Sequence, residues 1–304
     1  MIGRSVKVMQ RGRIAFSKES ALRHREEMVN LLYPVGKSGN SLKERQHLVH
    51  NHPIYNFLHT YYRYSTDSLL KYSPGLLMVS NRLVGATQSD LDEGLLHDQY
   101  LVFDRKGGAR YDIKELAGES KQSRKKLDTL KRNLQILKSS SQRQPLFSCY
   151  GLHEWAMLYK NNEKHQNALD TRLSQEQIDA VVESNPLRCT HYDAFRFFAK
   201  DAQGLNRLPL TRSMQVEKEQ TACIHATMDL FKYAYILYPL CSSKLLRDTL
   251  KVALRARYID MRASPYDVSA FEGCHEAIRV ESEEGRKEYA REQEALLEIS
   301  APLR

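Results

Sequence analysis

The segment that most constrains the fold is ACIHATMDLFKYAYILYPL, residues 222–240. As a helix it is apolar on almost every side, which is typical of a helix enclosed by the rest of the protein. Four polar side chains nevertheless share one helical face, at i, i+4, i+7 and i+8: His225, Asp229, Lys232 and Tyr233. Because a buried charge is costly unless it is paired or used, this face predicts one of two things. It is a satisfied network, in which Asp229 accepts from His225 and Lys232, or it is the wall of a pocket.

Helical periodicity recurs along most of the chain. Helices are expected over residues 19–34, 53–63, 113–138, 146–162, 174–184, 191–199, 219–240, 242–262 and 282–298. The stretch before residue 113 differs, because it contains the short apolar runs LLMVSNRLV and QYLVFD and the hairpin signal DRKGGARYDI. We therefore expect a mainly α fold, with a small β-sheet of two to four strands near residues 76–112.

The chain is expected to have three parts. Residues 1–18 contain five Lys or Arg residues and no acid, and predict a basic, disordered arm. The polar run SSSQRQP then separates an N-terminal helical part with the small sheet, residues 19–140, from a helical part that carries the site, residues 141–304. The last two parts can also form one continuous domain.

Charge and cysteine content narrow the classes of partner and compartment. The net charge is +9, with −3 over residues 276–304 and +12 over the rest of the chain. A basic body favours nucleic acid, phosphorylated ligands or another anionic partner. No apolar run reaches the roughly 18 residues of a membrane span, so no membrane partner is expected. The five cysteines are scattered singly without a CxxC pair, which argues against a zinc ribbon or a disulfide framework and indicates an intracellular, reducing compartment.

Other segments of the second half also place polar side chains among apolar ones. They are GLHEWAMLYK (151–160), LRCTHYDAFRFF (187–198), LNRLPLTRSMQVEKEQ (205–220) and YIDMRASPYD (258–267). Their repetition favours a shared site over surface solvation. In the first of them, His153 and Glu154 are adjacent and therefore point about 100° apart on a helix. We expect His153 to be the one that faces the site.

HPIYNFLHTYY, GLHEWAMLY, LRCTHYDAFRFF, LTRSMQVEKEQTACIHATMDLFKYAY and DMRASPYD together resemble a family of bacterial and eukaryotic proteins commonly labelled 3-methyladenine DNA glycosylase. The resemblance runs from about residue 50 to 290. It implies a hydrolase of DNA repair that releases damaged bases from DNA without a cofactor. Such an enzyme flips the base, stacks it on aromatic rings and stabilises the sugar cation with a carboxylate.

The residues that fit these roles divide into two sets. The candidate catalytic residues are Asp193, Asp229, Asp260 and His225. The candidate substrate-binding residues are Trp155, Tyr192, Arg207, Arg212, Lys232 and Arg262.

Two alternatives from other classes stay open. The first is a metal-dependent enzyme of the non-heme iron type that acts on a small molecule, because imidazoles and carboxylates suit a divalent transition metal such as iron. Its candidate ligands are His153, Glu154, His191, His225 and Asp229. The second is a non-enzymatic protein that binds a small phosphorylated ligand through Arg188, Arg207, Arg212 and Lys232. The partner is accordingly DNA or a small anionic substrate.

Overall fold

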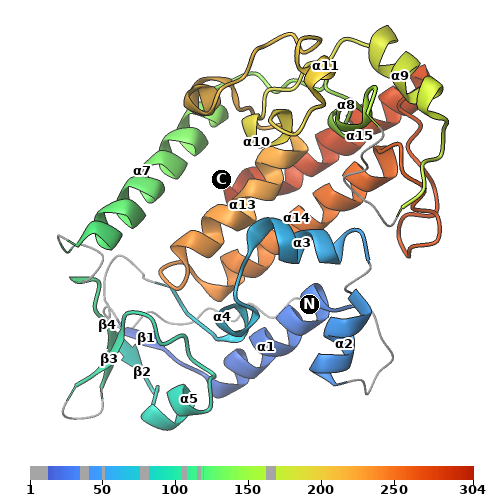
Figure 1. The fold of residues 1–304 in the computed structure, drawn as a ribbon. Coiled ribbons are helices and arrows are strands. Elements are labelled where there is room, and N and C mark those ends of the chain that lie inside the picture. The colour runs from blue at the N-terminus through green and yellow to red at the C-terminus, as the bar shows by residue number, and fades with distance from the viewer. Residues whose placement is uncertain are drawn as a thin grey trace, which may run out of the picture. The chain divides into compact units, whose positions relative to one another are not determined.

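The computed structural model describes residues 13–34, 41–49, 52–75, 82–104, 108–114, 118, 120–161 and 169–304 (Figure 1). The chain forms two compact units. Unit 1 comprises Met1–Pro34, Tyr64–Leu130 and Ala234–Arg247, and unit 2 comprises Val35–Arg63, Lys131–Tyr233 and Asp248–Arg304. Neither unit is a continuous stretch of sequence, whereas the sequence suggested a division near residue 140.

The elements of both units are mainly helical, as the sequence predicts. Unit 1 contains α1 (Lys18–Leu32), α4 (Thr66–Leu70), α5 (Gln88–Asp92), β1 (Arg13–Ala15), β2 (Arg82–Val84), β3 (Leu101–Phe103) and β4 (Ala109–Tyr111). Unit 2 contains α2 (Leu42–Val49), α3 (Tyr55–Tyr62), α8 (His153–Leu158), α9 (Gln175–Ser184), α10 (Tyr192–Phe195), α11 (Lys200–Gln203), η1 (Arg212–Met214), α12 (Gln215–Lys218), α15 (Glu283–Ser300) and η2 (Ala301–Leu303). The unit boundaries fall inside α7 (Lys121–Ser141), α13 (Ile224–Leu237) and α14 (Ser243–Ala263).

The small sheet of unit 1 has four strands in the order β1-β2-β4-β3 (Figure 1). β3 and β4 form the expected antiparallel hairpin, and β2 is also antiparallel to β4. β1 lies parallel to β2 and comes from residues that the sequence assigned to a disordered arm. Its three residues are too few to show an alternating pattern. Residues 1–12 of that arm, residues 76–81 and residues 105–107 near the hairpin tip lie outside the described residues.

The helix in 222–240 is enclosed in the way its composition predicts. Every residue from 221 to 231 is buried, and Met228 and Phe231 are fully shielded from solvent. The helices expected over 19–34, 53–63, 174–184, 242–262 and 282–298 are confirmed as α1, α3, α9, α14 and α15. Among the described residues, no helix combines the length and the apolar composition that a membrane span requires.

Four helices are shorter than their periodicity predicts. The segment 146–162 is helical only as α8, because Tyr150 and Gly151 adopt left-handed backbone angles with φ of 47° and 70°. A right-handed helix cannot pass through such residues. The helix predicted over 191–199 is reduced to α10, and α13 begins at Ile224 after the separate short helix α12. The long charged helix α7 begins only after Gly118.

Candidate metal centre

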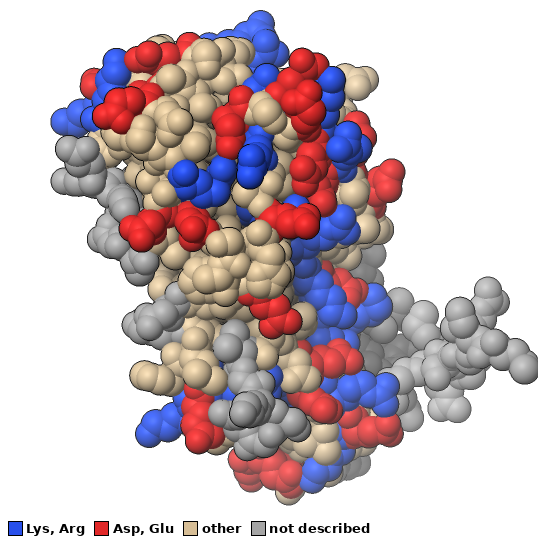
Figure 2. All heavy atoms as spheres, turned by 90° about the vertical axis from the view of Figure 1, so that its right-hand side faces the viewer, with Lys and Arg blue, Asp and Glu red and all other residues tan. Residues whose placement is uncertain are grey.

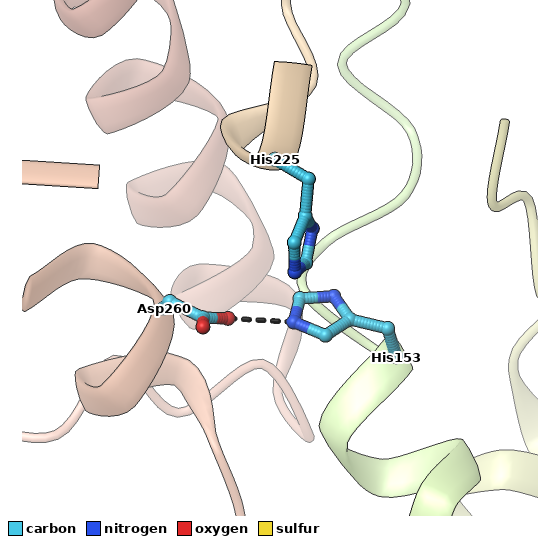
Figure 3. Close-up of side chains that lie close together, drawn as sticks. All are labelled: His153, His225 and Asp260. Carbon is cyan, nitrogen blue, oxygen red and sulfur yellow. Dashed lines mark hydrogen bonds and ion pairs between the residues drawn. The ribbon is translucent and has the colours of Figure 1, made fainter. Parts of the chain in front are cut away.

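Three helical segments within unit 2 bring two imidazoles and one carboxylate together (Figure 3). His153 is the first residue of α8, His225 lies in the first turn of α13, and Asp260 lies in α14. The ligand atoms that these three side chains offer all lie within 4.8 Å of one another. We call them the two-histidine group. All three are buried, with exposed fractions of 6%, 8% and 1%, so a charge placed among them would be shielded from water.

The contacts inside the two-histidine group orient its atoms. His153 Nε2 lies 2.6 Å from Asp260 Oδ1. Because a carboxylate can only accept, Nε2 carries the proton in this contact. The ring of His225 stands edge-on to the ring of His153, with 4.4 Å between centroids and 81° between planes. Burial and the neighbouring His153 lower the pKa of His225 well below its usual value, so His225 is neutral, which is the state in which an imidazole binds a metal.

The buried side chain of Arg257 contacts the carboxylate of the two-histidine group. Arg257, one turn before Asp260 on α14, donates from Nη1 to Asp260 Oδ2 and to Glu154 Oε1, the latter at 3.1 Å. Its guanidinium also stacks on the ring of Phe57 in α3, 3.8 Å from the centroid. Burial opposes ionisation of Asp260, but His153 and Arg257 outweigh it and hold the pKa of the carboxyl well below its usual range. Asp260 is therefore an anion.

Three buried atoms around Arg257 have no hydrogen-bond partner in the described part of the chain. They are Nε and Nη2 of Arg257 and Oε2 of Glu154. The usual cost of such an atom is about 1–3 kcal/mol. Glu154 thus contacts Arg257 directly, and His153 is connected to Arg257 through Asp260. Both residues belong to the site, whereas we expected His153 alone to face it.

A second group lies beside the first. His191, just before α10, places Nε2 3.3 Å from Asp229 Oδ2 and 3.6 Å from Glu219 Oε1. We call these three buried residues the one-histidine group. The ring of His191 is stacked on that of His225, with 5.4 Å between centroids. The two groups therefore share a contact through His225.

Cations and a phenol already contact the carboxylates of the one-histidine group. Lys232 Nζ lies 3.4 and 3.5 Å from the two oxygens of Asp229, and the hydroxyl of Tyr61 donates to Oδ1 at 3.2 Å. Burial opposes the charge on Asp229, but Lys232 and His191 outweigh it and lower the pKa to about 2. Burial likewise opposes charge on His191, but Glu219 and Asp229 raise its pKa. This group is largely neutralised by its own neighbours.

A small cavity of about 20 Å³ adjoins His153 and His225. Arg188, which is exposed, also lines it. The other lining residues are Cys149, Leu152, Leu187, Cys189, Thr190, Phe198, Cys223 and Ile224. All five cysteines of the chain are free thiols.

The predicted polar residues are thus only partly brought together. Asp193 is connected to the one-histidine group through Lys232, which contacts both Asp229 and, at 3.2 Å, Asp193 Oδ2. Asp229 accepts from Lys232, as the network alternative expected, but its imidazole partner is His191 and not His225. Asp260 belongs to the other group.

The remaining candidates lie elsewhere. Trp155 is fully buried and donates its indole N–H to Ala263 O at 2.9 Å, so its ring is not free to stack a ligand. Arg262 pairs with Glu288 at 3.2 Å. Three other candidates contact neither group in the described structure: Tyr192, which is half-buried, and Arg207 and Arg212, which are exposed.

Sequence reasoning did not single out Arg257, Glu219 or Tyr61 as site residues. Arg257 carried a usable signal, because it stands three residues before Asp260 inside an apolar helical stretch. Glu219 follows the short helix α12, and Tyr61 comes from a segment more than 160 residues away from Asp229. Only the folded chain brings Tyr61 and Glu219 to Asp229.

The surface drawn in Figure 2 carries mixed charge, with Lys and Arg interspersed among Asp and Glu and no continuous basic band. Comparison of the chain with protein-family models, with curated proteins and with solved structures yields no match. The functional argument therefore depends on the chemistry of the two groups.

Proposed function

We propose that this chain is a metal-dependent enzyme of the non-heme iron type, which acts on a small molecule at the two-histidine group. The observation that supports it is the donor set itself, with two imidazoles and one carboxylate buried within 4.8 Å of one another. Two histidines and one carboxylate on one face of an ion leave positions open for substrates, and iron is the ion that commonly uses this set. When bound, the ion would act as a Lewis acid or activate a bound small molecule.

The contact between His153 and Asp260 is compatible with an ion shared by the two side chains. Two ligands of a first-row ion stand roughly 3 Å apart when each lies about 2.1 Å from it. His153 Nε2 and Asp260 Oδ1, at 2.6 Å, need to separate by only a few tenths of an ångström. To act as a ligand through Nε2, His153 would have to carry its proton on Nδ1. Arg257 holds the other oxygen of Asp260 and so leaves Oδ1 directed at the ion position.

We assign the ion to the two-histidine group alone. Both oxygens of Asp229 already have an ammonium within 3.5 Å, and a second cation there would be repelled. The one-histidine group instead contacts His225 through the stacked ring of His191. One ion per chain follows from this assignment.

Base release from DNA, which the family resemblance implies, is less well supported by the site. Its carboxylate must stand next to an extruded base in a pocket that encloses the base. Asp229 and Asp260 are each 1% exposed, and they are already paired with Lys232 and Arg257, so neither carboxylate is free to face a sugar cation. Binding of a phosphorylated ligand would use Arg207 and Arg212, which contact neither group in the described residues.

The test is the metal content of protein purified without a histidine tag and reloaded anaerobically with Fe(II). We expect one ion per chain, lost in His153→Ala and Asp260→Asn and retained in His275→Ala, whose imidazole is exposed. The same preparations are incubated with alkylated duplex DNA, with and without chelator. Release of free base in chelator by protein that holds no metal would overturn the proposal and favour the glycosylase.

A further inference from the structure

Helix α7 carries apolar side chains that the rest of the protein leaves partly uncovered (Figure 1). Four of its leucines follow the a and d spacing of a heptad repeat, and we call them the leucine seam: Leu127, Leu130, Leu134 and Leu137. Leu127 and Leu134 are 37% and 50% exposed, and the other two are half-buried. The buried stripe of α7 is a different one, formed by Asn133, Ile136 and Ser140. The leucine seam is therefore not the face that holds α7 to the protein.

The same helix is strongly basic. It contains seven Lys or Arg residues and one acid, which gives it a net charge of +6. Arg124, Lys131 and Lys138 lie next to the leucine seam, because each stands three or four residues from Leu127 or Leu134. All three cations are exposed. This face of α7 thus combines hydrocarbon with positive charge from Arg124 to Lys138, over about 21 Å of helix.

We infer that the leucine seam and its flanking cations bind an amphipathic helix of a partner protein, with acidic residues beside its own apolar stripe. Paired helices bury their a and d side chains against one another, and the charges that flank these positions select the partner. A second copy of α7 does not fit, because two helices of charge +6 would repel each other. The inference is independent of the metal proposed for the two-histidine group.

Two other anionic partners fit this face less well. The phosphates of nucleic acid match the cations, but they offer no hydrocarbon to cover Leu127 and Leu134. A helix that lies in a lipid surface needs a wide apolar face, whereas an a and d stripe is the narrow seam of a helix pair. An acidic amphipathic helix matches both the charge and the width of the seam.

The test uses a labelled synthetic helix, about four heptads long, with Leu at a and d and Glu at e and g. Its binding to the full chain is followed by fluorescence anisotropy, beside the same peptide with Lys at e and g, duplex DNA and phosphatidylserine vesicles. Leu134→Ala removes an exposed leucine of the seam, and the double variant Lys131→Glu/Lys138→Glu reverses the charge beside it. The matched controls are Leu205→Ala, at a leucine that is 43% exposed, and Lys251→Glu, at an exposed position of α14.

We expect the Glu peptide to bind wild type and both control variants with the same Kd. Leu134→Ala should raise that Kd by about tenfold, and the charge-reversed variant should lose the Glu peptide and gain the Lys peptide. The inference would be overturned if wild type does not bind the Glu peptide or binds both peptides equally. Tighter binding of DNA or vesicles that Leu134→Ala leaves unchanged would overturn it in favour of a general anion surface. A dimer of wild type that Leu134→Ala dissociates would overturn it in favour of a second copy of the chain.

Discussion

Replacement of Arg257 by methionine is expected to destabilise the metal-free protein and to make it more responsive to metal. Arg257 is 1% exposed, and its Nη1 contacts both Glu154 and Asp260. Removal of one partner from a buried ion pair costs about 3–5 kcal/mol, because the other charge stays buried. The change also removes two unpartnered donors, Nε and Nη2, whose usual cost is about 1–3 kcal/mol each. Taking the two donors at about 1 kcal/mol each, we therefore expect a net loss of about 1–3 kcal/mol, with methionine retaining part of the packing on Phe57.

Thermal unfolding measures this loss. For a chain of this size, a change of 1 kcal/mol shifts Tm by about 2 °C, so the Arg257→Met variant should unfold about 2–6 °C below wild type. A divalent ion at about 100 times its Kd adds about 2.7 kcal/mol. Co(II), a substitute for Fe(II) that is stable in air, should raise Tm more in Arg257→Met than in wild type, because the variant lacks a cation that repels the ion.

The matched control is Arg255→Met on the same helix. Arg255 is 43% exposed and contacts Glu292 at 3.6 Å, and such surface pairs contribute about 0–1 kcal/mol. Its Tm should stay close to that of wild type with and without Co(II). Equal deficits in the two variants would refute the energetic role of Arg257. A Co(II) shift no larger in Arg257→Met than in wild type would refute the placement of the ion next to Asp260.

Two further predictions concern other buried groups. Asp229→Asn should lower Tm, because it leaves Lys232 with one carboxylate fewer, but it should keep one ion per chain; loss of the ion would show that the one-histidine group binds it. In unit 1, burial and Arg247, which donates to Nδ1 at 2.9 Å, lower the pKa of His24 from 6.5 to about 4. The unfolded chain, in which His24 keeps its usual pKa of 6.5, therefore takes up this proton at a higher pH than the folded chain. The contribution of His24 to stability is complete above pH 6.5 and falls by about 3 kcal/mol as the pH drops through 4. Urea unfolding at pH 7 and pH 4.5 should show a smaller loss in His24→Gln, and an equal loss would contradict this cause.

The sequence predicts the helices better than it predicts the pairing of their polar residues. The enclosed helix with His225 and Asp229 could be recognised because nearly all its residues are apolar, and burial from 221 to 231 follows from that composition. The two residues were expected to act together, yet they belong to different groups. One turn of helix separates them by about 6 Å along the axis, enough for each to meet different partners.

Long-range contacts explain the rest of the difference. Asp260 and His153 are 107 positions apart, and no local pattern specifies which carboxylate meets which imidazole. Trp155 illustrates the opposite error, because an aromatic residue next to a His-Glu pair suggested ligand stacking while its ring fills the core. The parallel strand β1 was missed because strand pairing at a sheet edge depends on the partner strand and not on three residues of sequence.

The central claim is that one ion binds between α8, α13 and α14. The most direct measurement is anomalous diffraction on both sides of the iron absorption edge, from crystals of untagged protein reloaded anaerobically with Fe(II). The account predicts a single strong peak at about 2.0–2.2 Å from His153 Nε2, a ring nitrogen of His225 and Asp260 Oδ1. A peak among His191, Glu219 and Asp229, or iron found only at exposed side chains, would contradict it.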